Sequence, residues 1–153
     1  PVVEGRLLQT LDLSSHDDVL EIGTGSGFVT ACLSHLAREV VSLDMHADFI
    51  EQAKLRLNEA GLRNVRLECA DVFHWQNDRQ FEAIAVTAAV SDIPEMFGRW
   101  LKPNGRMFII RGLSPVQEAL RVTHRAGVLH EESLFETDVP YLHGAEPTAR
   151  FTL

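Results

Sequence analysis

The chain has 153 residues, of which 45% are hydrophobic and 24% are charged, proportions that are ordinary for a globular protein. This length allows one domain with a sizeable core, and no apolar run approaches the length of a membrane span. The formal net charge of −8 at pH 7 argues against a general binder of nucleic acid or of anionic membranes.

Predicted helices and strands alternate along the chain up to residue 110. Apolar positions at helical spacing predict helices over residues 2–11, 28–38, 47–60 and 93–101. Short apolar or alternating runs predict strands over residues 17–22, 39–43, 64–69, 81–86 and 106–110. Such alternation is typical of a parallel sheet with helices on both faces.

Glycine and proline set several of these boundaries. Gly61 follows the third predicted helix, where left-handed backbone geometry is usual. Pro94 lies near the start of the fourth, where proline is favoured. Residues 102–105, with the sequence Lys-Pro-Asn-Gly, predict a turn before the last of these strands.

The end of the chain changes character. Residues 116–125 and 128–139 are both strand-like and flank Ala126 and Gly127, which predicts an antiparallel hairpin added to the edge of the sheet. Residues 117–120 are also compatible with a helix.

The run VLEIGTGSG, residues 19–27, joins the first predicted strand to the helix that follows it. Its three glycines alternate with Thr24 and Ser26, and glycine permits positive φ and the close approach of a ligand to the backbone. The spacing G-x-G-x-G is one residue short of the dinucleotide fingerprint G-x-G-x-x-G. It therefore favours S-adenosylmethionine (SAM) over a dinucleotide.

Acidic residues stand at or just after the carboxyl ends of the first three predicted strands, where open α/β sheets bind ligands. Glu21 suits an ammonium group, directly or through water, Asp44 suits both ribose hydroxyls, and Asp71 suits the amine of adenine. SAM carries a sulfonium and an ammonium but no phosphate, so an acidic site suits it better than it suits a pyrophosphate. For Asp44 and Asp71, a helix N-cap or loop role is the alternative.

Residues near these acids are candidate walls of the site. Met45 and His46 border the adenosine or begin a helix. We interpret His74 and Trp75 as a surface cover for the adenine, and Trp100 as a core residue.

The run VTAA, residues 86–89, directly follows the fourth strand. Its small side chains leave room where cofactor and acceptor would meet, although they are equally compatible with close packing.

Two cysteines, Cys32 and Cys69, stand in apolar contexts without the spacing of a metal site. We expect both to be buried free thiols of a cytoplasmic protein. The seven histidines form no H-x-x-x-H pair, so we expect no metal.

With these motifs the chain resembles the protein-L-isoaspartate O-methyltransferases, and the resemblance covers essentially the whole chain. The matching segments are VLEIGTGSGF (19–28), NVRLECAD (64–71), FEAIAVTAA (81–89), IPE (93–95), LKPNGRMFI (101–109), Gln117 and DVPYL (138–142). Many methyltransferases share the glycine motif, whereas the VTAA run, the gap to IPE and the late V-P-x-L pattern are more specific.

The resemblance implies a Rossmann-like, three-layer α/β/α methyltransferase fold, in which a mostly parallel seven-stranded sheet ends in an antiparallel hairpin. It implies one SAM-binding domain over residues 1–153, shortened at its N-terminus, because the family usually carries an additional N-terminal region with a hydroxyl-rich loop. The implied activity is protein repair: methylation of the side-chain carboxylate of L-isoaspartyl residues in damaged proteins, which leaves S-adenosyl-L-homocysteine. No membrane or nucleic acid partner is expected.

The resemblance also assigns residues to the two sides of the site. Cofactor contacts are implied at Glu21, Gly23, Thr24, Gly25, Ser26, Gly27, Asp44, Met45, Asp71, Val72 and Thr87, with a candidate contact at Gln117. The acceptor would be bordered by Thr87, Ala88, Val139 and Pro140. A carboxylate is already ionised at neutral pH, so we expect no general base.

Three alternatives differ in function. A methyltransferase with another acceptor, such as a small molecule or RNA, fits the cofactor motifs equally well, although the acidic charge weighs against RNA. A catalytically inactive SAM-binding homologue also fits. An NAD-dependent oxidoreductase is disfavoured by the glycine spacing and by the lack of a catalytic His or Tyr–Lys arrangement.

Overall fold

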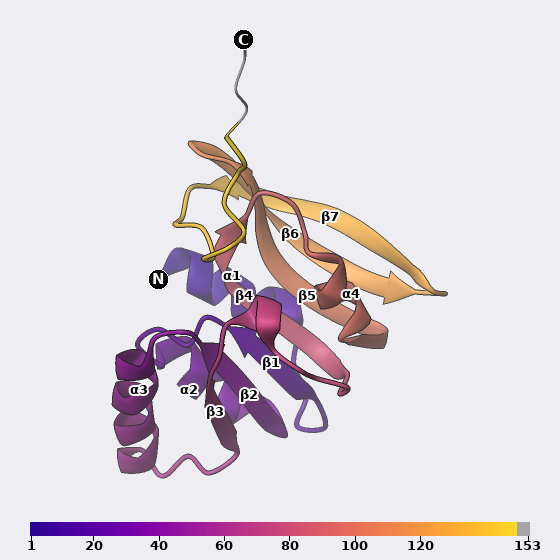
Figure 1. Ribbon diagram of the computed structural model, residues 1–153. Coiled ribbons are helices and arrows are strands. Elements are labelled where there is room, and N and C mark those ends of the chain that lie inside the picture. The colour runs from indigo at the N-terminus through magenta and orange to yellow at the C-terminus, as the bar shows by residue number, and fades with distance from the viewer. Residues whose placement is uncertain (150–153) are drawn as a thin grey trace.

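The predicted alternation of strands and helices forms a seven-stranded sheet in the computed structural model, which describes residues 1–149 (Figure 1). The helices are α1 (Val2–Leu11), α2 (Phe28–Leu36), α3 (Ala47–Glu59), the single 3₁₀ turn η1 (Val72–His74) and α4 (Glu95–Arg99). The strands are β1 (Asp18–Ile22), β2 (Glu39–Asp44), β3 (Val65–Cys69), β4 (Phe81–Val90), β5 (Leu101–Leu113), β6 (Val116–Arg125) and β7 (Val128–Thr137). None of the described helices is long and apolar enough to cross a membrane.

The strand order is β3-β2-β1-β4-β5-β6-β7. Strands β1 to β5 pair in parallel, whereas β6 pairs antiparallel with both β5 and β7. Between β6 and β7, Ala126 and Gly127 have φ of 50° and 76°, the positive values that a tight hairpin turn needs. The predicted parallel sheet with a C-terminal antiparallel hairpin is confirmed, and residues 117–120 form a strand rather than a helix.

The fourth helix and the fifth strand differ from the prediction. Helix α4 has only five residues and follows Pro94, which stays extended at ψ 132°. The predicted turn at residues 102–105 lies inside β5, where Asn104 takes a φ of 65°. The pairing of β4 with β5 shifts register between Phe81 and Ala83. The Pro-Asn-Gly sequence therefore produces a bulge in a continuous strand rather than a chain reversal.

The sheet carries one apolar cluster on each face, because successive strand residues point to opposite sides. On β1, Val19 packs with Leu7 of α1 and Leu33 of α2, whereas Leu20 packs with Phe97 of α4. Figure 1 shows α1 and α2 behind the sheet and α4 in front of it. By the same alternation, Glu21 points toward the face of α2.

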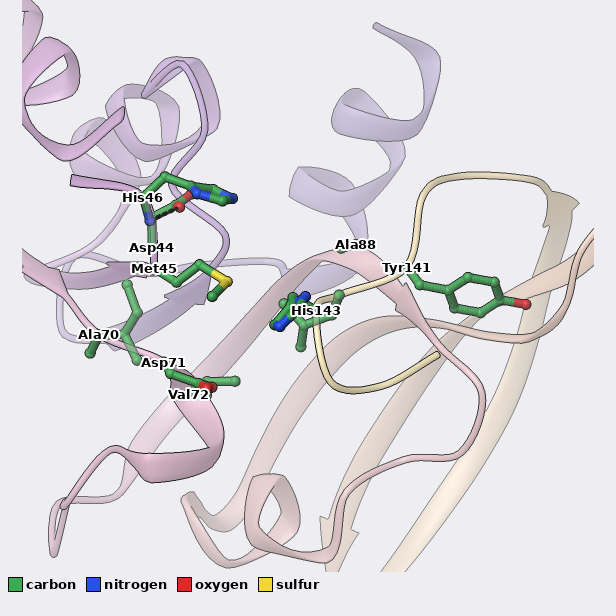
Figure 2. Close-up of a pocket in the computed structure, with 11 residues that line it drawn as sticks. Asp44, Met45, His46, Ala70, Asp71, Val72, Ala88, Tyr141 and His143 are labelled. Carbon is green, nitrogen blue, oxygen red and sulfur yellow. Dashed lines mark hydrogen bonds between the residues drawn. The ribbon is translucent and has the colours of Figure 1, made fainter. Parts of the chain in front are cut away.

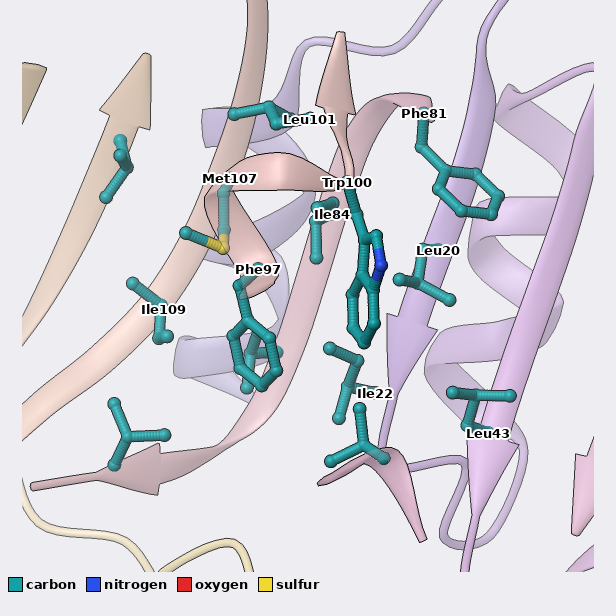
Figure 3. Packing of buried hydrophobic residues seen from close by; sticks show 14 of the residues in the cluster. Leu20, Ile22, Leu43, Phe81, Ile84, Phe97, Trp100, Leu101, Met107 and Ile109 are labelled. Carbon is teal, nitrogen blue, oxygen red and sulfur yellow. The ribbon is translucent and has the colours of Figure 1, made fainter. Parts of the chain in front are cut away.

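The front cluster depends on a short helix. Figure 3 shows Phe97 and Trp100 inserted among side chains of the central strands, and the two rings stack at 5.8 Å. Trp100 is a core residue, as predicted. Phe97 of α4 and the adjacent Trp100 thus fix this short helix to the front face of the sheet.

The prediction of two buried cysteines is wrong. Cys69 is exposed and Cys32 only half-buried. Cys69 ends β3, which is the edge strand of the sheet, so no further strand covers it.

We expect Phe97→Ala to lower the free energy of unfolding by about 3–5 kcal/mol, because truncating a buried aromatic side chain leaves a cavity that closes only in part. Phe97 is 0% exposed, and Leu113, at 63%, provides the control. Leu113→Ala should change stability by less than about 0.5 kcal/mol. Urea unfolding measures both, and similar losses in the two variants would contradict the anchoring role of α4.

Candidate functional site

The glycine loop between β1 and α2 has the backbone geometry that its sequence predicts. Gly23, Gly25 and Gly27 have φ of 102°, 52° and 84°. A Cβ added at Gly23 would collide with Thr87 Oγ1, and one at Gly27 would lie 3.1 Å from Ala53 Cβ. At Gly25 a Cβ would meet nothing within 4 Å. The first and third glycines therefore serve the protein's own packing, and space for a ligand lies at Gly25.

The loop is held over the ends of neighbouring strands. The N–H groups of Gly23 and Thr24 donate to the Leu43 carbonyl of β2 at 2.8 and 3.1 Å. Asp44, the last residue of β2, accepts from the Gly25 N–H through Oδ2 at 3.0 Å. Its other oxygen accepts from the His46 N–H at 2.9 Å. These bonds fix the Asp44 carboxylate between the loop and α3, and a carboxylate keeps further lone pairs for a ligand.

A pocket of about 190 Å³ opens at this edge of the sheet (Figure 2). It is lined by Leu43, Asp44, Met45, His46, Ala70, Asp71, Val72, Ala88, Tyr141, Leu142 and His143. The structure thus brings together five of the predicted site residues: Asp44, Met45, Asp71, Val72 and Ala88. His46, the N-cap residue of α3, was a candidate from the sequence, whereas Leu43, Ala70 and His143 were not expected. The DVPYL run contained the signal for the adjacent Tyr141 and Leu142.

Asp71 has both of the roles considered for it. It caps η1 by accepting from the Phe73 N–H at 3.0 Å, and it lines the pocket. His74 Nδ1 lies 3.1 Å from its other oxygen. The Phe73 hydrogen bond, followed by the one to His74, lowers the pKa of Asp71, so its carboxylate is ionised at neutral pH.

Glu21 lies behind the glycine loop and does not line the pocket. Its Oε1 accepts from the hydroxyls of Thr30 and Ser42, the latter at 2.5 Å, and Ser42 is linked at 2.6 Å to Thr24 of the loop. The other oxygen, Oε2, is buried without a partner. Burial raises the pKa of Glu21 to about 7, and the charge of Asp44 adds to this effect.

Thr87 turns its hydroxyl toward the loop. It donates to the Gly23 carbonyl at 2.8 Å, and the Ile22 carbonyl lies at 3.1 Å. Two positions further, the Ala89 N–H donates to the Pro140 carbonyl at 2.9 Å, and the Ala89 carbonyl accepts from Leu142 at 2.7 Å. Residues 140–142 therefore run alongside the end of β4.

Gln117, for which the sequence implies a candidate cofactor contact, has its side-chain hydrogen bonds within the protein. Gln117 is 0% exposed and does not line the pocket. Its amide donates to the Val139 carbonyl at 3.2 Å and accepts from the Val139 N–H at 2.8 Å. Val139 and Pro140 do not line the pocket either; they hold the chain that places Tyr141 and His143 there.

Trp75 also lies away from the pocket, in contrast to its interpretation as a cover for adenine. Its indole donates to Glu68 at 2.7 Å and packs edge-on against Trp100. Ser26 is exposed at the tip of the loop, and its carbonyl accepts from Arg56 at 2.8 Å. Within residues 1–149, no group of three or more His, Cys, Asp or Glu side chains is arranged to hold a metal ion.

Comparison with known proteins gives a consistent family. The family model described as protein-L-isoaspartate(D-aspartate) O-methyltransferase matches residues 1–141. The protein-L-isoaspartate O-methyltransferase of Roseobacter denitrificans is 38% identical over 94% of this chain and 69% of its own length. The protein of the same name from Dictyoglomus thermophilum is 36% identical over 88% of this chain and 61% of its own length. The chain thus spans about two thirds of the length of these curated relatives.

Solved structures agree on the fold. A structure described as a protein-L-isoaspartate O-methyltransferase has a TM-score of 0.84 and 26% identity, and covers 95% of this chain and 48% of its own. A Plasmodium falciparum candidate of the same kind, in complex with S-adenosyl-L-homocysteine, has a TM-score of 0.83 at 20% identity, over 93% of this chain and 73% of its own. The Rossmann-like methyltransferase fold is confirmed.

The raised pKa of Glu21 predicts a pH-dependent stability. An unfolded glutamate ionises near 4.5 and Glu21 in the folded protein near 7, so stability present below pH 4.5 is lost as the pH rises to 7. Glu21→Gln removes this loss. Relative to wild type, the variant should gain roughly 2–3 kcal/mol between pH 5 and pH 8. Urea unfolding at both pH values measures the gain, and Glu59→Gln, at an exposed position, is the control. An equal difference at both pH values would contradict the raised pKa.

Proposed function

Since the chain belongs to the protein-L-isoaspartate(D-aspartate) O-methyltransferase family, we propose that it transfers a methyl group from SAM to the side-chain carboxylate of L-isoaspartyl residues in damaged proteins. The observation that carries this proposal is the meeting of Asp44, Asp71 and Ala88 in one pocket beside the glycine loop. Two carboxylates and a small wall residue suit a cationic cofactor and leave room for an acceptor.

The residues present fit SAM in charge and polarity. Asp44 offers carboxylate oxygens for the ribose hydroxyls, and Asp71 can accept from the amine of adenine. Met45 and Val72 supply apolar walls, and the open space at Gly25 admits close approach to the backbone. Among the described residues, the pocket lining includes no lysine or arginine, in agreement with a ligand that lacks phosphate.

Glu21 fits the cationic part of the same ligand. Its Oε2 is a buried oxygen without a partner, linked to the glycine loop through Ser42 and Thr24. A nearby positive charge would favour the ionised carboxylate and offset the effect of burial on its pKa. We assign Glu21 to the ammonium side of the site, acting from behind the loop.

No residue is assigned as an acid or base. SAM, when bound, supplies a methyl group activated by a positively charged sulfur. The acceptor carboxylate is ionised at neutral pH and needs no proton removed. The protein's contribution is to hold the acceptor oxygen in line and to exclude water. Ala88 and residues 141–143 form the pocket wall closest to β4 and are assigned to the acceptor side.

The biological role that follows is protein repair, since an isoaspartyl methyl ester closes to a succinimide with loss of methanol, and water can reopen the succinimide to aspartate. The proposed partner is a damaged protein or peptide, and the proposed location is the cytoplasm, supported by the free thiols of Cys32 and Cys69.

Paired peptides test the acceptor. We expect S-adenosylhomocysteine to form with a peptide that contains one L-isoaspartyl residue and not with the same sequence containing aspartate. Turnover of neither peptide, together with measurable binding of S-adenosylhomocysteine, would indicate a non-catalytic SAM-binding protein. Equal turnover of both would indicate another carboxylate acceptor.

Replacing Asp44 tests the cofactor site. Asp44→Ala should weaken binding of S-adenosylhomocysteine by roughly 1–3 kcal/mol, because the ribose hydroxyls lose their acceptor. Asp48→Ala removes an exposed carboxylate in the first turn of α3 and should leave the affinity unchanged. Isothermal calorimetry measures both variants. Equal affinities in two folded variants would place the ribose elsewhere.

A further inference from the structure

Thr87 occupies an irregular part of β4. The pairing of β4 with β5 shifts register between Ala85 and Ala89, and Thr87 lies within this shift. Its side chain points toward the glycine loop, where Oγ1 donates to the Gly23 carbonyl at 2.8 Å. Thr87 is not among the residues that line the pocket. Its hydroxyl is thus used within the protein.

Gly23 and Thr87 fit each other as a pair. Gly23 has a φ of 102°, and an added Cβ would collide with the Thr87 hydroxyl oxygen. The Gly23 N–H donates to the Leu43 carbonyl at 2.8 Å, so its two flanking peptides are tied to β2 on one side and to β4 on the other. The loop is therefore held by Thr87 of β4 as well as by β2.

The two residues after Thr87 contact the part of the pocket assigned to the acceptor. Ala88, the next residue, lines the pocket. Ala89 exchanges backbone hydrogen bonds with Pro140 and Leu142, at 2.9 and 2.7 Å. Residues 87–89 thus connect the glycine loop with residues 140–142.

We propose that Thr87 is a positioning residue, whose hydroxyl fixes the distance between the glycine loop and the acceptor wall of Ala88 and residues 141–143. This inference rests on the proposed function, which names the two sides. In-line transfer between two bound groups is sensitive to their separation, and a displacement of about 1 Å can cost about 100-fold in rate. Thr87 therefore acts on the reaction through the loop, without touching the acceptor.

Two substitutions separate the hydroxyl from the bulk of the side chain. Thr87→Ser keeps the hydroxyl and loses the methyl group, whereas Thr87→Val keeps the volume and places a methyl group against the Gly23 carbonyl. With the isoaspartyl peptide, we expect kcat to fall about tenfold or more in Thr87→Val and less than about threefold in Thr87→Ser. The KM for the peptide should change less than about threefold in both, since Thr87 does not contact the acceptor. A larger loss in Thr87→Ser than in Thr87→Val would mean that Thr87 only fills space, and would overturn the proposal.

A measurement without ligand keeps this inference separate from the proposed function. The amides of Gly23 and Thr24 both donate to Leu43, so a displaced loop exposes them. We expect their hydrogen exchange to be about tenfold faster in Thr87→Val than in wild type, and unchanged in Thr87→Ser. Thr123→Val, at a half-buried strand position outside the site, is the control for exchange and for turnover. Unchanged exchange in Thr87→Val would overturn the inference even if wild type methylates the peptide. Inactive wild type with faster exchange in the variant would overturn only the proposed function.

A double-mutant cycle tests the pairing itself. Gly23→Ala should weaken S-adenosylhomocysteine binding more in wild type than in the Thr87→Ala background, because the second substitution removes the colliding oxygen. The cost of positive φ remains in both backgrounds, so the difference reports the contact alone. Strict additivity of the two substitutions would show that the side chains at 23 and 87 do not meet, and would overturn the pairing.

Discussion

The register of β1 with its two neighbouring strands is the constraint on which the site depends. Ile22, the last residue of β1, pairs with Leu43 of β2 on one side and with Val86 of β4 on the other. The chain leaving each strand therefore starts at the same level of the sheet. The glycine loop, Asp44 and Thr87 follow these three residues directly, which is why residues from positions 23 to 87 meet within hydrogen-bonding distance. A slip of one residue in β1 would turn its side chains to the opposite faces and separate the three.

The same register places Glu21 at a buried position, where burial disfavours the ionised carboxylate. Glu21 lies opposite Ser42 of β2, whose hydroxyl donates to it, and Thr30 at the start of α2 donates from above. Two hydroxyls satisfy one oxygen and leave Oε2 unpartnered, so desolvation dominates and the pKa rises to about 7. An apolar side chain would be more stable here. A carboxylate at this position lowers the stability of the free protein, but it attracts a cationic ligand.

Much of this could be predicted because it follows from local sequence. Strand ends, the glycine spacing and the acids that follow successive strands are patterns within a few residues, and they predicted Asp44 and Asp71, which line one pocket in the structure. Side-chain partners that are distant in sequence could not be predicted in this way. Gln117 and Thr87 are polar residues of the kind that contact ligands, yet their partners are Val139 and Gly23, which no local pattern reveals. Trp75 likewise followed an acid but packs on Trp100.

The late V-P pattern illustrates how a motif can act through the backbone. The Val139 N–H and carbonyl are both held by the buried amide of Gln117, and the Pro140 carbonyl accepts from Ala89. Proline lacks an N–H, so Pro140 pairs with Ala89 through its carbonyl and has no backbone donor that needs a partner. These contacts fix the chain just before it enters the pocket at Tyr141. The tyrosine hydroxyl then donates to Gly112 and accepts from Ser114, which anchors the segment to the end of β5. Residues 139–142 are thus bound to β4, β5 and β6. The sheet therefore sets the position of the acceptor wall, as it sets the position of the glycine loop.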